Sequence, residues 1–197
     1  MLSDVPFASK STPYLVFRSH RRAWMLGNAL YMLIACFAYI LIVILASVAV
    51  SASYAYVQNQ WSPLAQLLVQ DQSAYQLSSY RFIGTNIMNA LSPYGACLLQ
   101  WSLLSLYAFA ICGVMLLINT VQKRSVGFAA AMLFHGLMFV MYLDGHPVGY
   151  YLSLFTHANA RVLPAQGHSQ FLSFLALTGF SACMYGLSLG LSRKMDI

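Results

Sequence analysis

The sequence contains no glutamate, and its four aspartates are the only acidic residues among 197. Only 7% of the residues are charged, against about 25% in a typical soluble domain. General acid–base catalysis draws mainly on His, Asp and Glu, and we find no paired carboxylates and no nucleophile beside a base. A Gly-rich phosphate-binding loop is also missing from the sequence. We therefore expect a protein that is not an enzyme and that carries no cofactor.

Cysteine is scarce as well, and no two cysteines form a C-x-x-C pair. All four lie within or at the ends of apolar runs, where a single cysteine usually serves as a small packing residue. The sequence alone therefore gives no redox or metal role to Cys36, Cys97, Cys112 and Cys183.

The sequence is rich in long apolar runs, and 60% of its residues are hydrophobic. A membrane-spanning helix needs roughly 17–25 mostly apolar residues, and its backbone must be hydrogen-bonded internally because lipid offers no partners. We predict an all-α integral membrane protein with four transmembrane helices and one interfacial or re-entrant outer helix. The predicted spans cover about 24–51, 94–121, 126–143 and 170–192.

Two Ser-Pro pairs predict helix starts outside the membrane, because Ser caps a helix and Pro suits its first position. Ser62-Pro63 opens S-P-L-A-Q-L-L-V-Q, which is short and rich in Gln and therefore fits an interfacial or re-entrant helix. Ser92-Pro93 opens the second span.

The net charge of +6 is explained by topology rather than by a nucleic-acid partner. Lys and Arg favour the cytoplasmic ends of spans, so the turn 122–125 is placed inside. This orientation divides the chain into a basic, amphipathic lead-in (1–22), a four-span domain (23–192) and a short tail (193–197), with both termini cytoplasmic in the inner or plasma membrane. The basic residues then inside are Lys10, Arg18, Arg21, Arg22, Lys123, Arg124, Arg193 and Lys194, and those outside are Arg81 and Arg161.

Small residues recur in the second and third spans. They let helices approach closely in lipid, where no hydrophobic force drives helices together. We expect helix contacts at Ser102, Ser105, Ala108, Ala110, Gly113, Gly127, Ala129, Ala130, Ala131 and Gly136.

His135 is the one ionisable side chain predicted near the middle of a span, and such residues are functional candidates by default. A haem would need a second axial ligand at the same depth, and no other histidine is placed there. We expect a neutral imidazole that is hydrogen-bonded to a neighbouring helix. His146, His157 and His168 share the outer loop 144–169, but their spacing matches no short zinc signature.

The order of these features resembles the C-terminal part of small bacterial ABC-2-type ABC transporter permease subunits. Basic residues lead into RSHRRAWMLGNALYMLIACFAYILIVIL, followed by a polar outer segment, an S-P-opened helix and the K-R turn. An aromatic outer loop, YYLSLFTHANARVL, precedes a last span that ends in Arg-Lys. The likeness covers most of residues 14–192 and lies in layout rather than in a catalytic motif.

The resemblance implies a permease that works with a separate soluble ATPase and with another permease chain, in the lipid bilayer, to export a hydrophobic or peptide-like substrate. The family has six helices, so its first two are absent here or come from another chain. By analogy the ATPase contact would involve Tyr14, Phe17, Arg18, Arg21 and Arg22, with Lys123 and Arg124 in the turn.

Two other functions remain open from the sequence. The chain could be an accessory or assembly subunit of a larger membrane complex, packing through its small-residue faces. It could also be a small membrane enzyme that uses His135, although the shortage of acidic residues disfavours this.

Overall fold

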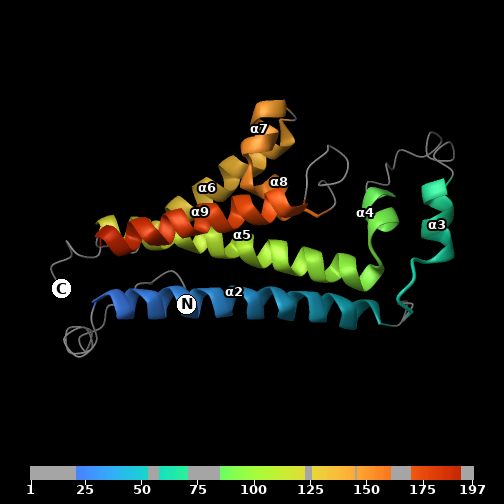
Figure 1. Ribbon diagram of the computed structural model, residues 1–197, viewed down its shortest axis with the longest axis horizontal. Coiled ribbons are helices and arrows are strands. Elements are labelled where there is room, and N and C mark those ends of the chain that lie inside the picture. The colour runs from blue at the N-terminus through green and yellow to red at the C-terminus, as the bar shows by residue number, and fades with distance from the viewer. Residues whose placement is uncertain are drawn as a thin grey trace.

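The computed structural model describes residues 21–52, 58–70, 85–122, 126–144, 146–160 and 170–191, and every regular element in these ranges is an α-helix (Figure 1). The helices are α2 (Arg21–Ser51), α3 (Pro63–Gln70), α4 (Thr85–Ala90), α5 (Pro93–Gln122), α6 (Gly127–Leu143), α7 (Pro147–Leu152), α8 (Leu154–Ala158) and α9 (Gln170–Leu191).

Three helices, α2, α5 and α9, are long and apolar enough to cross a membrane. Their bounds, like those of α6, lie within three residues of the predicted spans. The all-α fold with helices that could span a membrane is therefore confirmed, but the count of four spans is not, because α6 has only 17 residues. At about 1.5 Å per residue α6 measures roughly 25 Å, somewhat less than the roughly 30 Å of a hydrocarbon core.

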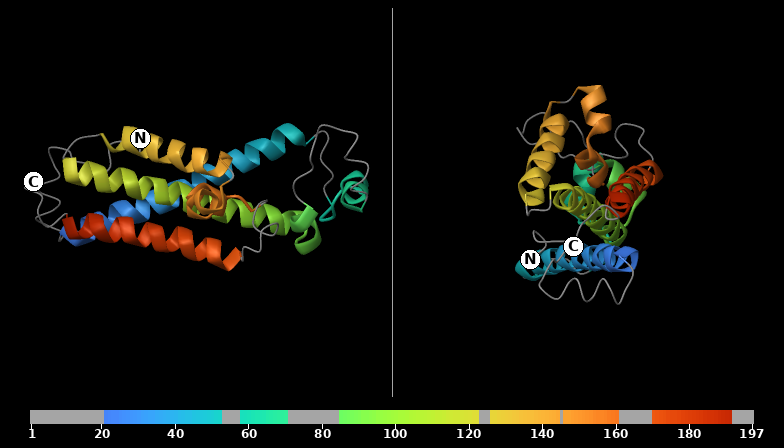
Figure 2. Two further views of the ribbon diagram at one scale, coloured as in Figure 1. Left: turned by 90° about the horizontal axis from the view of Figure 1, so that it is seen from above. Right: turned by 90° about the vertical axis from the view of Figure 1, so that its left-hand side faces the viewer.

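Helix α5 is the centre of the molecule and contacts α2, α6, α8 and α9. Helix α2 lies along one side of α5, and α6 to α9 cover the other side (Figures 1 and 2). The first residues of α2 and α6 and the last residues of α5 and α9 all lie at the left-hand end of Figure 1. The four long helices therefore alternate in direction along the chain.

Close packing between α5 and α9 depends on small residues, as the sequence predicts for this part of the chain. A Cβ atom added at Gly113 would lie 3.0 Å from the Tyr185 ring and 3.1 Å from the Met184 side chain. Ser105 and Ala110 of α5 are fully buried. In α6 the expectation holds only in part, because Gly127 and Ala131 are buried whereas Ala129 and Gly136 are exposed.

Both Ser-Pro helix starts are confirmed. The Ser62 hydroxyl accepts a hydrogen bond from the Ala65 amide (3.2 Å) at the start of α3, and the Ser92 hydroxyl accepts one from the Gly95 amide (3.4 Å) at the start of α5. The Trp61 indole N–H donates to the Leu91 carbonyl (2.9 Å), which ties the start of α3 to the start of α5.

Candidate functional site

Helix α8 is the most deeply enclosed short element of the chain. It has only five residues, yet it contacts α5, α6 and α9, and four of its side chains are buried. The sequence predicts an outer loop over 144–169. The part of it that the structure describes continues from α6 as α7, at the top of Figure 1, and then returns to the long helices as α8. Helices α5, α6 and α9 therefore enclose α8.

Two polar side chains, those of Ser153 and Gln100, make hydrogen bonds that hold α8 between these helices. The Ser153 hydroxyl, at the junction of α7 and α8, donates to the Met138 carbonyl of α6 (2.6 Å). The Gln100 amide of α5 donates to the Ala158 carbonyl and accepts from the Ala160 N–H, both at 3.1 Å. A single glutamine thus satisfies two backbone groups at the end of α8 that the short helix leaves unpaired.

His157 is buried in α8, and both of its ring nitrogens lie near polar atoms. Its Nδ1 lies 3.0 Å from the Ser173 hydroxyl of α9, and its Nε2 lies 3.1 Å from the Tyr151 carbonyl. Since a carbonyl only accepts, Nε2 carries the proton and Nδ1 accepts from Ser173 in the neutral ring. This arrangement fixes α8 to α9 and leaves neither nitrogen directed towards an open site.

An aromatic cluster surrounds Phe155, which projects from α8. Its ring centroid lies 5.9 Å from that of Tyr107, 5.4 Å from that of Phe139 and 5.2 Å from that of Tyr142. The contacts are edge-to-face, the arrangement favoured by the charge distribution of aromatic rings. The aromatic residues that mark the outer segment in the sequence therefore pack against α5 and α6.

Tyr150 of α7 extends this cluster towards the end of α6, with its ring 6.0 Å from that of Tyr142. Burial raises the pKa of the Tyr150 phenol above its ordinary value, and the neighbouring phenols of Tyr142 and Tyr151 act in the same direction. The Tyr150 hydroxyl therefore remains a neutral hydrogen-bond donor at physiological pH.

His135 lies at the edge of the aromatic cluster. Its Nδ1 is 2.8 Å from the Tyr107 hydroxyl of α5, and its ring lies 6.0 Å from that of Phe155. This is a hydrogen bond to a neighbouring helix, of the kind expected from the sequence. The imidazole is half-buried, and a neutral ring that accepts from a phenol has its remaining N–H on Nε2.

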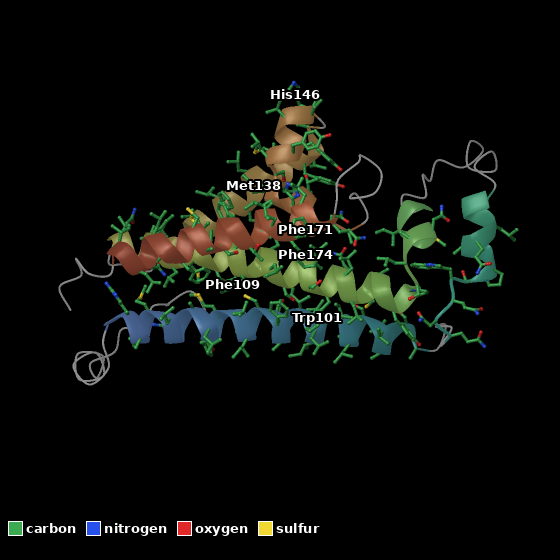
Figure 3. All side chains as sticks on the ribbon, in the orientation of Figure 1. Trp101, Phe109, Met138, His146, Phe171 and Phe174 are labelled. Atoms are coloured by element: carbon green, nitrogen blue, oxygen red, sulfur yellow. The ribbon has the colours of Figure 1, made fainter. Side chains whose placement is uncertain are left out.

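Among the described residues, the other acidic and histidine side chains do not join this pair. His146 is exposed at the tip of α7, far from α5 (Figure 3), and Asp144 is exposed at the end of α6. His168 lies outside the described residues. Within the described ranges no three His, Cys, Asp or Glu side chains gather as metal ligands. The His135–Tyr107 pair thus has the chemistry of an interhelical hydrogen bond and no carboxylate partner in the described part of the chain.

The residues predicted to contact an ATPase fall mostly outside the described part of the chain. Tyr14, Phe17, Arg18, Lys123 and Arg124 all lie there. Arg21 is the first residue of α2, and Arg22 follows it with an exposed side chain.

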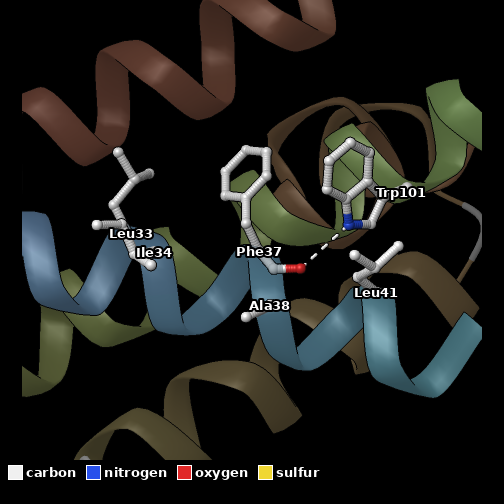
Figure 4. A pocket seen from close by; sticks show the side chains of 6 residues that line it. All are labelled: Leu33, Ile34, Phe37, Ala38, Leu41 and Trp101. Atoms are coloured by element: carbon white, nitrogen blue, oxygen red, sulfur yellow. Dashed lines mark hydrogen bonds between the residues drawn. The ribbon is translucent and has the colours of Figure 1, made fainter.

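A shallow apolar groove of about 380 Å³ opens on the side of α2 and α5 (Figure 4). Trp101 of α5 forms one wall, and its indole N–H donates to the Phe37 carbonyl of α2 (3.1 Å). With that donor engaged, the groove offers almost no polar surface and fits an acyl chain or an apolar side chain of another helix. It is lined by Leu33, Ile34, Phe37, Ala38, Leu41 and Trp101.

The residues that hold α8 in place were not predicted from the sequence. Gln100 and Ser153 are ordinary polar residues in apolar surroundings, and nothing in their spacing indicates that they meet backbone groups 58 and 15 residues away. The buried His157 was grouped with the outer-loop histidines because its spacing was the only signal.

Comparison of the chain with protein-family models, with curated proteins and with solved structures gave no match.

Proposed function

We propose that α2, α5, α6 and α9 all cross the membrane, with the end of the bundle at Arg22 and Gln122 on the cytoplasmic side. The observation that supports this topology is the shared end of the four helices in Figure 1. The basic segments 1–22, 122–125 and 192–197 adjoin that end along the chain, and basic residues favour the cytoplasm. Helix α3, at the opposite end, is then the interfacial outer helix.

Within this topology we propose that the protein is the permease subunit of an ABC-type exporter, coupled to a separate ATPase that drives movement of a hydrophobic or peptide-like substrate. The observation that carries this proposal is the continuity of α2, which runs from the basic lead-in at Arg21 along α5 to Ser51 without a break. A push on the lead-in would therefore be transmitted directly to the central helix.

The turn 122–125 provides a second connection to the bundle. The Asn119 side-chain oxygen of α5 accepts a hydrogen bond from the Gly127 amide at the start of α6 (2.7 Å). Because this bond lies just inside the turn, a force applied at Lys123 or Arg124 would move the ends of α5 and α6 together.

Helix α2 also leaves room for another permease chain. Only 6% of its most apolar 18-residue window is buried. Large apolar side chains such as Leu30, Ile34 and Ile42 are more than half exposed. This surface can contact lipid or the helices of a second chain.

An accessory or assembly subunit of a larger membrane complex is the second candidate, and the groove beside Trp101 favours it. The groove is shallow and open at the flank of the bundle, so it fits a side chain from a partner helix better than a substrate in transit.

Purification from native membranes in mild detergent tests the two functions. We expect the unmutated chain to recover a soluble ATPase in stoichiometric amount, and its absence would contradict the permease proposal. Replacing Arg18, Arg21 and Arg22 together by Gln removes charge but keeps length, and a permease should then lose its ATPase. An accessory subunit should still enter its complex after this change. The matched control is Arg81→Gln with Arg161→Gln, which alters the two basic residues that the charge pattern assigns to the outer side and should leave recovery unchanged.

A further inference from the structure

Two of the four cysteines meet inside the helix bundle although 76 residues separate them in sequence. The Sγ atoms of Cys36 in α2 and Cys112 in α5 lie 3.7 Å apart. The other two, Cys97 and Cys183, are exposed on the flanks of their helices. The fold thus singles out one pair of thiols that face each other between two helices.

A thioether side chain lies about one helical turn before Cys36 on α2. Met32 precedes Cys36 by four residues, so the two side chains share one face of α2, and Met32 is fully buried. The Tyr185 hydroxyl of α9 lies 3.4 Å from the Met32 Sδ atom. The same hydroxyl lies 3.2 Å from the Phe109 carbonyl of α5, so the Met32 sulfur is directed towards α5, as the Cys36 thiol is. Figure 3 shows sulfur atoms along the line where α2 faces α5.

The surroundings of these sulfurs are apolar. Met25, Met115 and Leu116 belong to the same buried cluster, and Phe109 stacks on Tyr185 with ring centroids 4.3 Å apart. Cys36 lies 15 residues from both Arg21 and Ser51, at the midpoint of α2, which in the proposed topology is near the middle of the hydrocarbon core. Water and hard oxygen ligands are scarce at such a place.

From this geometry we propose that Cys36, Cys112 and Met32 form a binding site for a soft monovalent metal ion, Cu(I). Thiolate and thioether ligands select Cu(I), whereas Mg²⁺ and Ca²⁺ need oxygen ligands. Two sulfurs 3.7 Å apart can both ligate one small ion without a large movement of α2 relative to α5. The inference concerns metal binding by this chain alone and does not depend on the proposed transport function.

The number of ligands favours Cu(I) over zinc, because structural Zn²⁺ sites almost always have four protein ligands and only three sulfurs are proposed here. One Cu(I) ion enters and the Cys36 and Cys112 thiols each lose a proton, because the thiolate is the form of cysteine that binds metals. Two thiolates and the Met32 thioether then hold the ion in a site of net charge −1. No electron is transferred, and the copper is supplied in its reduced state.

Tyr185 is a positioning residue for this site. Its hydroxyl lies 3.2 Å from the Phe109 carbonyl as well as 3.4 Å from the Met32 Sδ atom, and it has one proton to donate. Donation to the carbonyl leaves the sulfur lone pairs of Met32 available to the metal. Donation to the sulfur holds Met32 in place when the metal is absent.

The test measures Cu(I) binding by the purified full chain in detergent under reducing conditions, by competition with a chromophoric Cu(I) chelator. We expect one Cu(I) per chain, and the redox-inert ion Ag(I) should compete for it. X-ray absorption on the unmutated protein should show sulfur ligands alone. Nitrogen or oxygen ligands in that spectrum, or no binding under reducing conditions, would overturn the proposal.

Variants locate the site. Cys36→Ser and Cys112→Ser should each lower the affinity at least 100-fold, and Met32→Leu should lower it about 10-fold. The matched controls are the double variant Cys97→Ser with Cys183→Ser, and Met25→Leu, which lies two turns from Met32 on the same helix. Full binding in the Cys36 and Cys112 variants, or its loss in the controls, would contradict the assignment. Circular dichroism and size-exclusion chromatography verify that each variant is folded, and the absorption spectrum of the unmutated protein decides the matter if a variant is not.

Discussion

Gly127 stands where the start of α6 comes closest to the end of α5. A Cβ atom there would overlap the Met115 carbonyl oxygen and lie 2.5 Å from the Asn119 side-chain oxygen. The first of these neighbours is backbone and cannot rotate away. The same Asn119 oxygen accepts the Gly127 N–H, so the close approach and the hydrogen bond depend on each other.

Gly127→Ala should therefore destabilise the protein by about 2 kcal/mol or more, from steric overlap and from the loss of the interaction that caps α6. The free energy of unfolding can be measured by titrating the detergent-solubilised protein with sodium dodecyl sulfate. Gly136→Ala is the matched control, because nothing lies within 4 Å of a Cβ atom there. Equal stability of the two variants would refute this account of the turn.

The His135–Tyr107 hydrogen bond joins α6 to α5 in apolar surroundings. Hydrogen bonds between membrane helices contribute on average about 0.6 kcal/mol, and at most about 1.7. We expect Tyr107→Phe and His135→Phe each to lower the free energy of unfolding by about 1 kcal/mol. In the double variant the losses should not add, because both changes remove the same bond. Additive losses in the same titration would show that the bond contributes nothing.

At the scale of elements, the placement of α8 depends on Gln100. Its amide reaches both the Ala158 carbonyl and the Ala160 N–H, and these are the last polar backbone groups that hold α8 against α5. Helix α8 itself is too short to be stable without such contacts.

Gln100→Leu should release α8 while leaving α5 intact, because Leu favours a helix and cannot form either hydrogen bond. We expect at least a tenfold increase in amide hydrogen exchange across 154–160, measured by mass spectrometry, with little change in α2. Gln100→Glu keeps an acceptor for the Ala160 N–H but loses the donor to Ala158, and should give an intermediate rate. Unchanged exchange in Gln100→Leu would mean that Ser153 and His157 suffice to hold α8.

At the scale of the whole molecule, the alternation of α2, α5, α6 and α9 predicts on which side of the membrane each end lies. Single cysteines at Gln122 and Asp144, introduced into a chain whose own cysteines are replaced, bracket the short helix α6. A membrane-impermeant thiol reagent should label Asp144→Cys in intact cells, and should label Gln122→Cys only after the membrane is opened. Labelling of both positions from the outside would show that α6 does not cross.

The helices themselves were largely predictable from the amino-acid order. Apolar runs between polar turns gave the bounds of α2, α5, α6 and α9 within three residues, and Ser62-Pro63 and Ser92-Pro93 gave the starts of α3 and α5. These signals are local, because an apolar segment in lipid must form the hydrogen bonds of its backbone N–H and C=O groups within its own helix.

Contacts between helices were not predictable in the same way. The pairs Cys36–Cys112, Gln100–Ala158 and His157–Ser173 join residues 76, 58 and 16 positions apart, and each needs two elements to be in place first. The return of the chain to the bundle as α8 also escaped prediction, since an aromatic, turn-rich segment fits a surface loop equally well.

Composition and periodicity alone thus predicted an all-helical protein, the bounds of its long helices and their ability to span a membrane, because the backbone hydrogen bonds of such a helix are made within the helix itself. The tertiary structure decided which helix faces meet. Close packing at small residues, hydrogen bonds between helices and the pairing of two thiols each require a second helix to be in place. The candidate metal site between α2 and α5 belongs to this second kind. Its residues are unremarkable in sequence and become a ligand set only where the two helices lie side by side.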